Sequence, residues 1–356
     1  MRTKMQKYTS AMMAAVMALS MGSMQASAAD DVQNIVVIGD SVAAGNALTD
    51  AEQSYVELVG EYTGAKVQNF AAAGNTTQDV LDCLDHAQVQ AALAEADVIL
   101  VSVGMHDIMD PFMAKANEFM VQFGFQRFSD VFFASLADYN LDELDLMIYN
   151  GQLTSAVESN MEPAAANMLE IGEQLAAYPN AQVILSNAYN PIDTIENLDE
   201  LSSKRKDAYT TVCTTVSNTL NASVNQAIAE TAAANGYEVV DVHAAFKGFA
   251  YKYVNLSDLD MNATAAGHAL IAQKINALLG GTMTGDVNMD GAIDATDAAA
   301  VLIHAANTGS GGSGTLSDAA ETAADVNKDG TADSADAAKI LIYAAELGAD
   351  GNPSWD

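Results

Sequence analysis

The stretch Asn34-Ile-Val-Val-Ile-Gly-Asp-Ser41 decides the fold of the first part of this chain. Its β-branched run, bounded by a polar residue and a glycine, is typical of a strand that is buried on both faces of a sheet. The Gly-Asp-Ser that follows stands where such a strand ends and the chain turns. Similar short apolar runs recur further along the chain, at residues 65–70, 97–103, 182–186 and 237–242.

Helical patterns separate these apolar runs. Apolar residues recur three or four positions apart in segments 55–62, 77–96, 154–178, 206–234 and 264–279. Strands that alternate with helices form βαβ units, and these build a parallel sheet that helices cover on both faces. We therefore predict an α/β domain with three layers, α/β/α and flavodoxin-like, over residues 30–280.

Residues 110–152 interrupt this alternation between the third strand and the next helix, and they are rich in Phe and Met. Connections that leave the carboxyl ends of parallel strands border the binding crevice of such a sheet. We expect this insertion to form extra helices, which either roof a site or pack on the body of the domain.

The first 28 residues have the pattern of a secretory signal peptide. Arg2, Lys4 and Lys7 form a basic region, residues 11–19 are apolar, and Ala26-Ser27-Ala28 is a cleavage motif. The apolar run is shorter than the roughly 20 residues that a membrane-spanning helix needs, and no later segment is long and apolar enough to span. The pattern predicts a secreted, extracellular protein without a membrane span.

The composition is strongly acidic, with 47 Asp and Glu against 14 Lys and Arg and a formal net charge of -33. Nucleic acids and anionic lipids bind positively charged faces, so neither is an expected partner. Hydrophobic residues make up 50% of the chain, which is enough for a large core. The two cysteines, Cys83 and Cys213, allow either one disulfide or two free thiols.

An internal repeat follows Gly285. The segment DVNMDGAIDATD at 286–297 matches DVNKDGTADSAD at 325–336, which starts 39 residues later. An Ala-rich helix is predicted after each copy, at 298–306 and 337–347. A Gly/Ser linker at 307–316 separates the two copies.

Each repeat has the donor spacing of a calcium loop. Ca²⁺ takes about six to eight oxygen ligands, and a loop can supply them from alternate positions around a sharp turn at a glycine. Carboxylates at this density would repel one another without a cation, so we predict two bound Ca²⁺ ions. The predicted ligands are Asp286, Asn288, Asp290, the Ala292 carbonyl, Asp294 and Asp297 in one loop, and Asp325, Asn327, Asp329, the Thr331 carbonyl, Asp333 and Asp336 in the other.

With Asp at position 12 of both loops, residues 285–350 resemble a type I dockerin, a small all-α domain with two EF-hand-like calcium loops. The resemblance implies a cohesin module as partner, on a scaffolding protein of an extracellular, cellulosome-like complex that degrades polysaccharide. It also implies that loop positions 10 and 11 contact the cohesin, here Ala295, Thr296, Ser334 and Ala335. The spacer between the repeats is longer than usual, which leaves the class of cohesin open.

Four polar sites follow strands of the predicted sheet, and the carboxyl ends of parallel strands meet in one crevice. Ser41 follows the first strand and can be a nucleophile if a base lies beside it. Gly74 follows the second strand, where its backbone N–H can donate to an oxyanion. His106-Asp107 follows the third strand, and the segment 258–268 (DLDMNATAAGH) follows the fifth.

These blocks resemble those of the SGNH/GDSL hydrolase family over residues 33–279. The family uses a Ser, a Gly, an Asn in a G-x-N-D block, and an Asp-x-x-His pair in the last block. Ser41 and Gly74 match, but His106 stands where the family has Asn. In the last block Asn262, or Met261 with a one-residue shift, stands where the family has His. Asp258 and Asp260 are both candidates for the acid.

Two interpretations of this departure stay open. In the first, the Asn and His are exchanged, so that His106 is the base for Ser41, Asn262 donates to the oxyanion, and the group that orients His106 is unknown. In the second, the site is degenerate and the domain is a non-catalytic carbohydrate-binding or structural subunit. His268 is a weaker candidate base. We expect His243 to be structural, and His86 and His304 to lie on the surface.

Together the two resemblances imply a secreted serine esterase that needs no catalytic cofactor. The dockerin resemblance suggests that the protein acts in a complex that degrades polysaccharide. The expected substrate is therefore an acylated, most simply acetylated, polysaccharide, with anchoring to a cohesin-bearing scaffold.

Overall fold

The computed structural model describes residues 32–49, 51–122, 152–194, 203–255, 261–290, 292–348 and 355. They form a parallel sheet with strand order β2-β1-β3-β4-β5. The strands are β1 (Asn34–Gly39), β2 (Lys66–Asn69), β3 (Val98–Ser102), β4 (Gln182–Ser186) and β5 (Glu238–Val240). The predicted signal peptide lies outside the described residues. Within them, no helix is both long enough and apolar enough to cross a membrane.

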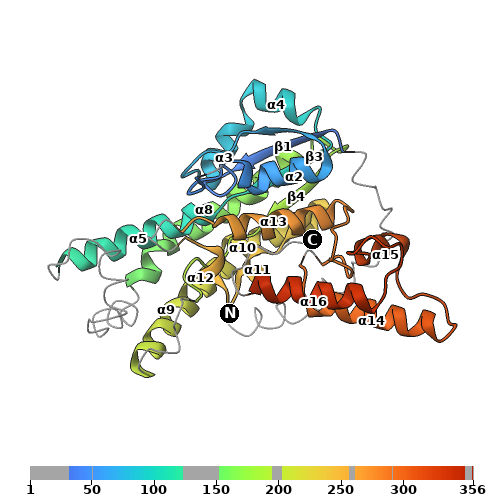
Figure 1. The fold of residues 1–356 in the computed structure, drawn as a ribbon. Coiled ribbons are helices and arrows are strands. Elements are labelled where there is room, and N and C mark those ends of the chain that lie inside the picture. Colours follow the sequence, from blue (N-terminus) through green and yellow to red (C-terminus); the bar gives the residue numbers. More distant parts are fainter. Residues whose placement is uncertain are drawn as a thin grey trace, which may run out of the picture.

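Helices cover both faces of this sheet (Figure 1). On one face α2 (Tyr55–Thr63) packs against α13 (Ala265–Leu278). On the other, α8 (Gln152–Leu175) packs against α3 (Thr77–Leu84) and α10 (Val224–Asn235). The structure confirms the predicted α/β/α layers.

The strand order puts the ends of β1 and β3 side by side at the centre of the sheet. The chain leaves β1 for β2 on one side and later returns to β3 on the other, so the direction of winding reverses between β1 and β3. Ligands of open parallel sheets bind outside the carboxyl ends of the strands at such a reversal. The topology therefore favours a site built from residues that follow β1 and β3.

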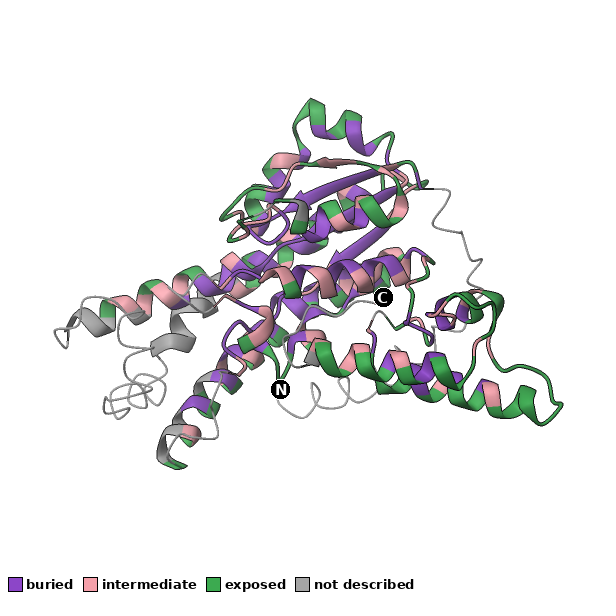
Figure 2. Cartoon of the chain, viewed as in Figure 1, coloured by how far each residue is buried: buried purple, intermediate pink, exposed green. Residues whose placement is uncertain are grey.

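The core lies around these same two strands (Figure 2). Ile35, Val36, Val37 and Ile38 have no exposed surface, and every residue of β3 is buried. Burial on both faces explains why the strand sequences are continuously apolar rather than alternating.

Two predicted helices are each divided in the structure. Segment 77–96 forms α3 and α4 (Ala87–Leu93), with His86 as the N-cap residue of α4. Segment 206–234 forms α9 (Ser203–Ala222) and α10, and Ser223 between them has non-helical backbone angles. The Ser223 hydroxyl donates to the Thr219 carbonyl at 2.6 Å, a side-chain bond that competes with helical pairing.

The predicted insertion begins inside a helix. Helix α5 (Met105–Gln122) continues through residue 110, and Phe112 is buried against the domain body. Residues 123–151 lie outside the described residues, so the rest of this prediction is untested. Among the described residues of this domain there are also the short helices η2 (Ala51–Gln53), α11 (Val242–Phe246) and α12 (Ala250–Tyr253).

The C-terminal region is helical and has a small core of its own. Helices α14 (Ala295–Gly309) and α16 (Ser334–Gly348) pack together over buried residues that include Val301 and Ile340. A further helix that the sequence analysis did not predict, α15 (Asp318–Ala324), precedes the second loop. Its N-cap signal is Ser317, whose side chain accepts from the Ala320 N–H.

His304 is buried, so the expectation that it lies on the surface is wrong. Its Nδ1 accepts the backbone N–H groups of Thr315 and Leu316, at 3.2 and 3.3 Å. The Gly/Ser linker is therefore tied to α14 at its far end, and its first residues, through Gly309, belong to that helix.

Two lysines of the first domain contact the C-terminal region. Lys274 Nζ on α13 donates to the Asp290 carbonyl at 3.0 Å, and Lys252 Nζ on α12 donates to the Leu347 carbonyl. The first repeat loop and the end of α16 therefore lie against α12 and α13. The predicted domain boundaries, 30–280 and 285–350, stay predictions.

Both cysteines are free thiols. Cys83 is half-buried, whereas Cys213 is buried and its Sγ donates to the Ile192 carbonyl at 2.7 Å. Burial raises the pKa of Cys213 to about 12, which leaves it as an unreactive thiol at neutral pH.

Candidate active site

The nucleophile position follows a tight contact between β1 and β3. A Cβ on Gly39 would lie 2.2 Å from the Ser102 carbonyl oxygen, so only glycine fits there. The Asp40 N–H donates to that same carbonyl at 2.9 Å. Ser41 comes next, in a turn, and its residue is only 3% exposed.

His106 lies within hydrogen-bond reach of Ser41. Helix α5 begins at Met105, just after β3, and Gly39 of β1 is in register with Ser102 of β3. The first turn of α5 therefore stands beside the turn that carries Ser41. His106 Nε2 lies 2.8 Å from Ser41 Oγ, a distance at which an imidazole can accept the hydroxyl proton.

Asp110 faces the other nitrogen of the same ring. His106 Nδ1 lies 3.0 Å from Asp110 Oδ1, and the two residues are four apart on α5, which places them on one helix face. Asp110 was not among the site residues predicted from the sequence. The signal was present as the spacing His106-x-x-x-Asp110 at a helix start. Ser41, His106 and Asp110 are connected in this order by two contacts at hydrogen-bond distance, as in a serine-histidine-aspartate triad.

Carboxylates near the site shift the titration of His106. The hydrogen bond with Asp110 raises the pKa of the imidazole above its ordinary 6.5, against an opposing effect of burial. Burial raises the pKa of Asp40 to about 6, although the Val42 N–H donates to its Oδ1 at 3.1 Å. Both groups near Ser41 therefore hold their protons to a higher pH than usual.

Gly74 presents its backbone N–H to the nucleophile. This N–H donates to Ser41 Oγ at 2.8 Å, and Gly74 has a left-handed φ of 80°. The next residue holds the loop in place, because Asn75 Nδ2 donates to the Gly39 carbonyl at 3.0 Å. A fixed N–H at this point can donate to an oxyanion that forms beside Ser41.

Asp107 points away from His106 and toward helix α3. Its two carboxylate oxygens accept the Thr77 N–H at 2.9 Å and the Thr77 hydroxyl at 2.7 Å. Although it is adjacent in sequence to His106, the group that contacts the imidazole is Asp110.

The last block is only partly described. Asp258 and Asp260 lie outside the described residues. Asn262 is buried just before α13, and its backbone carbonyl accepts the Asn255 N–H at 2.8 Å. Its role as an oxyanion donor stays a prediction.

The other candidate histidines of this domain have structural partners. His268 has no exposed surface, its Nδ1 accepts the Tyr55 N–H at 3.2 Å, and burial lowers its pKa to about 4. The ring also stacks on Tyr55. His243 Nδ1 donates to the Ala188 carbonyl at 3.1 Å. These contacts favour packing roles for both rings.

The two repeat loops fold alike. Asp286 Oδ1 accepts the Asp290 N–H at 3.1 Å, and Asp325 Oδ1 accepts the Asp329 N–H at 3.0 Å. The fourth residue of each loop has a left-handed φ, 57° at Met289 and 61° at Lys328. The sequence repeat is therefore also a repeat of backbone conformation.

The carboxylates at position 12 close both loops. Asp297 and Asp336 are fully buried, and each accepts backbone N–H groups from its own loop. The oxygen donors suit Ca²⁺ in type and order. However, no three His, Cys, Asp or Glu side chains of the described residues converge closely enough to hold a metal. Calcium ligation by these residues stays a prediction.

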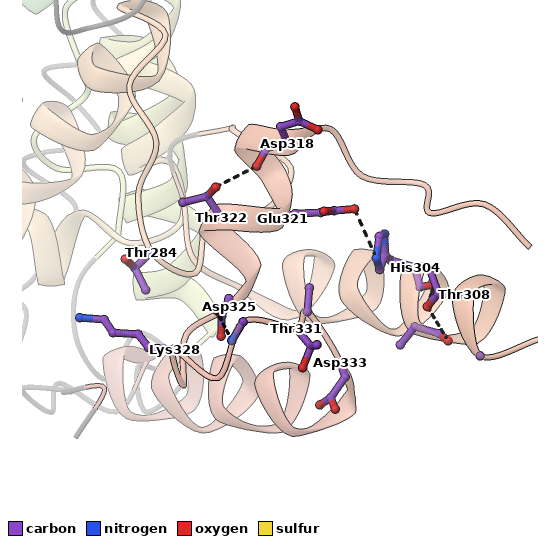
Figure 3. A pocket seen from close by; sticks show the side chains of 14 residues that line it. Thr284, His304, Thr308, Asp318, Glu321, Thr322, Asp325, Lys328, Thr331 and Asp333 are labelled. Carbon is purple, nitrogen blue, oxygen red and sulfur yellow. Dashed lines mark hydrogen bonds and ion pairs between the residues drawn. The ribbon is translucent and has the colours of Figure 1, made fainter. Parts of the chain in front are cut away.

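The surface around the second loop is hollowed. A cavity of about 890 Å³ lies between α14, α15 and this loop, and the side chains of Asp325, Thr331 and Asp333 border it (Figure 3). His304 Nε2 and Glu321 Oε1 face each other at 3.6 Å on its wall. The predicted cohesin contacts are exposed at the starts of α14 and α16: Ala295, Thr296, Ser334 and Ala335.

Comparisons with known proteins identify two families. Residues 37–270 match the model of the GDSL-like lipase/acylhydrolase family, and residues 284–343 match the type I dockerin domain. A comparison with curated proteins found no match.

Solved structures with a similar fold are distant in sequence. A lipase from a goat rumen metagenome is 17% identical, with 69% of this chain and 96% of that chain covered and a TM-score of 0.47. A phospholipase A1 from Streptomyces albidoflavus NA297 is 17% identical, with 67% and 94% covered and a TM-score of 0.46. An extracellular lipase from Streptomyces rimosus is 17% identical, with 67% and 95% covered and a TM-score of 0.45.

Proposed function

Because this chain belongs to the GDSL-like lipase/acylhydrolase family and carries a type I dockerin domain, we propose that it is a secreted, complex-associated serine esterase that uses Ser41, His106 and Asp110. The observation that carries the proposal is the 2.8 Å contact between His106 Nε2 and Ser41 Oγ. A nucleophile, a base and a group that orients the base are the three parts that acyl transfer by serine requires.

The geometry supports the following reaction. Ser41 Oγ attacks the ester carbonyl carbon while its proton passes to His106 Nε2, and Asp110 stabilises the imidazolium through Nδ1–H. The Gly74 N–H donates to the oxyanion of the tetrahedral intermediate. When the intermediate collapses, His106 returns the proton to the leaving alcohol. Water then hydrolyses the acyl-enzyme by the same steps, and Ser41 is regenerated.

This arrangement places the base and its carboxylate on one helix. His106 and Asp110 both belong to α5, which follows β3, whereas the family pattern places Asp and His in the last block. One helical turn supplies the pair, so hydrolysis would not depend on a histidine at position 262. The missing histidine of the last block suggested a degenerate site. In this proposal the base is instead His106, in the third block.

We propose an acylated, in particular acetylated, polysaccharide as the substrate. The support is the dockerin domain, whose cohesin partners belong to complexes that degrade polysaccharide. The negative charge of this part of the chain also favours an uncharged ester as substrate, since residues 30–284 include 34 acidic and 9 basic residues. The carboxylates of Asp40, Asp107 and Asp110 all act on the charge of His106, so an anionic substrate would be repelled there.

The proposed role of Asp110 is tested by its replacement with asparagine. In the native protein, activity requires neutral His106, so it should fall as the pH drops through the raised pKa of this imidazole, at a pH above 6.5. Asp110→Asn removes the main cause of the raised pKa, and the acid limb of kcat/KM should move to lower pH. We expect the plateau to fall by about 10- to 100-fold, because the ring also loses the carboxylate that orients it.

The matched control is Glu118→Gln, a carboxylate on the same helix that pairs with Lys115. It should change neither the plateau nor the acid limb of the profile recorded with a neutral p-nitrophenyl ester. An unchanged acid limb in Asp110→Asn would contradict the role assigned to Asp110.

A further inference from the structure

A buried pair of residues connects the two loops that approach Ser41 from different strands. Asp107 is 8% exposed and Thr77 is fully buried, and both hydrogen-bonding groups of Thr77 donate to the Asp107 carboxylate. Asp107 is adjacent to His106 on α5, while Thr77 begins α3 and lies three residues after Gly74. The pair therefore joins the segment that carries the proposed base to the segment that carries the proposed oxyanion donor.

Capping of α3 accounts for the Thr77 N–H in this pair but not for the Thr77 hydroxyl. Thr76 is the N-cap residue of α3, and it already forms a complete capping box with Asp79. Asp107 comes from another connection of the sheet, 30 residues away in sequence, and provides both acceptors at once. A carboxylate that held only a helix end would not need the Thr77 hydroxyl as well.

A third element fixes the hydroxyl in place. Asn167 Nδ2 on α8 donates to Thr77 Oγ1 at 3.1 Å, and α8 packs against both α3 and α5. The Thr77 hydroxyl thus accepts from α8 and donates to α5. Such a buried, satisfied network allows little relative movement of the three elements that it joins.

Position matters here because two groups contact the same atom. His106 Nε2 and the Gly74 N–H each lie 2.8 Å from Ser41 Oγ, but they belong to connections that leave different strands. A displacement of about 1 Å between reacting groups can cost roughly 100-fold in rate.

We propose that Asp107 and Thr77 are positioning residues, which hold the Gly74 loop and the start of α5 at the spacing that Ser41 chemistry needs. The inference rests on the proposed esterase function and deepens it. In this proposal both residues act on Ser41 chemistry through Gly74 and His106.

The test is Thr77→Val, which keeps the shape of the side chain and removes the hydroxyl. We expect kcat for a neutral p-nitrophenyl ester to fall by about 10- to 100-fold, with KM changed less than about 3-fold. The acid limb of the pH profile should stay in place, because Asp110 is intact. Thr77→Ser, which restores the hydroxyl, should recover most of kcat. Asp107→Asn, which weakens the same pair from its other side, should also lower kcat.

Thr231→Val is the matched control. Thr231 is equally buried, and its hydroxyl donates to the Met168 carbonyl at 3.3 Å, which joins α10 to α8 and neither loop at Ser41. Both Thr→Val variants should lose some thermal stability, but only Thr77→Val should lose kcat per folded molecule.

The outcomes separate this inference from the proposed function. If the native protein hydrolyses the ester in a Ser41-dependent manner, but Thr77→Val retains as much kcat as Thr231→Val, the positioning role is wrong and the esterase stands. If native protein and Ser41→Ala show the same turnover, the esterase proposal fails and takes the positioning role with it.

Discussion

Ser41→Ala should abolish ester hydrolysis, with kcat expected to fall by about 10⁴- to 10⁶-fold. The substitution removes the atom that His106 Nε2 and the Gly74 N–H both contact. Without Oγ no acyl-enzyme can form, so residual turnover would come only from water beside the remaining donors. The measurement is acetate release from an acetylated polysaccharide, together with hydrolysis of a neutral p-nitrophenyl ester.

His106→Ala should be about as severe, because Ser41 then has no base. The two losses should not add: Ser41→Ala with His106→Ala should be no slower than either single variant, as expected for residues that act as one unit. His86→Ala is the matched control, since this histidine is exposed at the start of α4 and its side chain makes no capping bond. It should retain native kcat.

The same experiment distinguishes the second class of function. A non-catalytic carbohydrate-binding or structural subunit would bind the polysaccharide without releasing acetate, and Ser41→Ala would bind it equally well. Equal turnover by native protein and Ser41→Ala would remove the esterase proposal.

Calcium should stabilise the C-terminal region strongly. From Gly285 onward the chain has 13 acidic and 2 basic residues, and most of the acidic ones fall in the two loops. At roughly 100 times its dissociation constant, Ca²⁺ would add about 2.7 kcal/mol per site to the free energy of unfolding. Removal of Ca²⁺ by a chelator should therefore melt α14 and α16, seen as lost helical circular dichroism in the full chain, while ester hydrolysis persists.

The variants Asp286→Asn and Asp318→Asn separate ligation from net charge. Both remove one negative charge, but Asp286 occupies the first loop position and Asp318 lies on the exposed start of α15. Only Asp286→Asn should weaken the rise in melting temperature that Ca²⁺ produces. If Ca²⁺ moved the melting temperature of neither native protein nor Asp318→Asn, the calcium prediction would be wrong.

Local sequence patterns were sufficient for the strands and the repeat. The run 35–38 and its counterparts locate the five strands of the described sheet. The signal is clearest for β1 and β3, because strands buried on both faces of a parallel sheet are continuously apolar. The loops at 286–297 and 325–336 were equally visible, since their oxygen donors and glycines occupy fixed positions. Segment 206–234 was predicted as one helix and forms two, and the Ser223 hydroxyl competes with helical pairing at the break.

Local patterns were not sufficient for pairs that only the fold brings together. The sequence pattern placed His304 on the exposed face of a helix. In the structure its ring is buried, because it accepts two backbone N–H groups of the Gly/Ser linker, 11 and 12 residues further along the chain. Likewise, the two cysteines left their pairing open until the structure placed them as separate thiols.

The sequence by itself determined the α/β/α architecture, the dockerin repeat and the identity of Ser41, Gly74 and His106 as candidates, because each depends on residue type at short, regular spacing. Only the tertiary structure decided which carboxylate faces His106. Asp107 is its neighbour in the chain, but one helical residue turns the side chain by about 100°, toward Thr77. Asp110, four residues on, returns to the face of His106 and contacts its Nδ1. The direction of a side chain from a helix, and not its distance along the sequence, selected the orienting group.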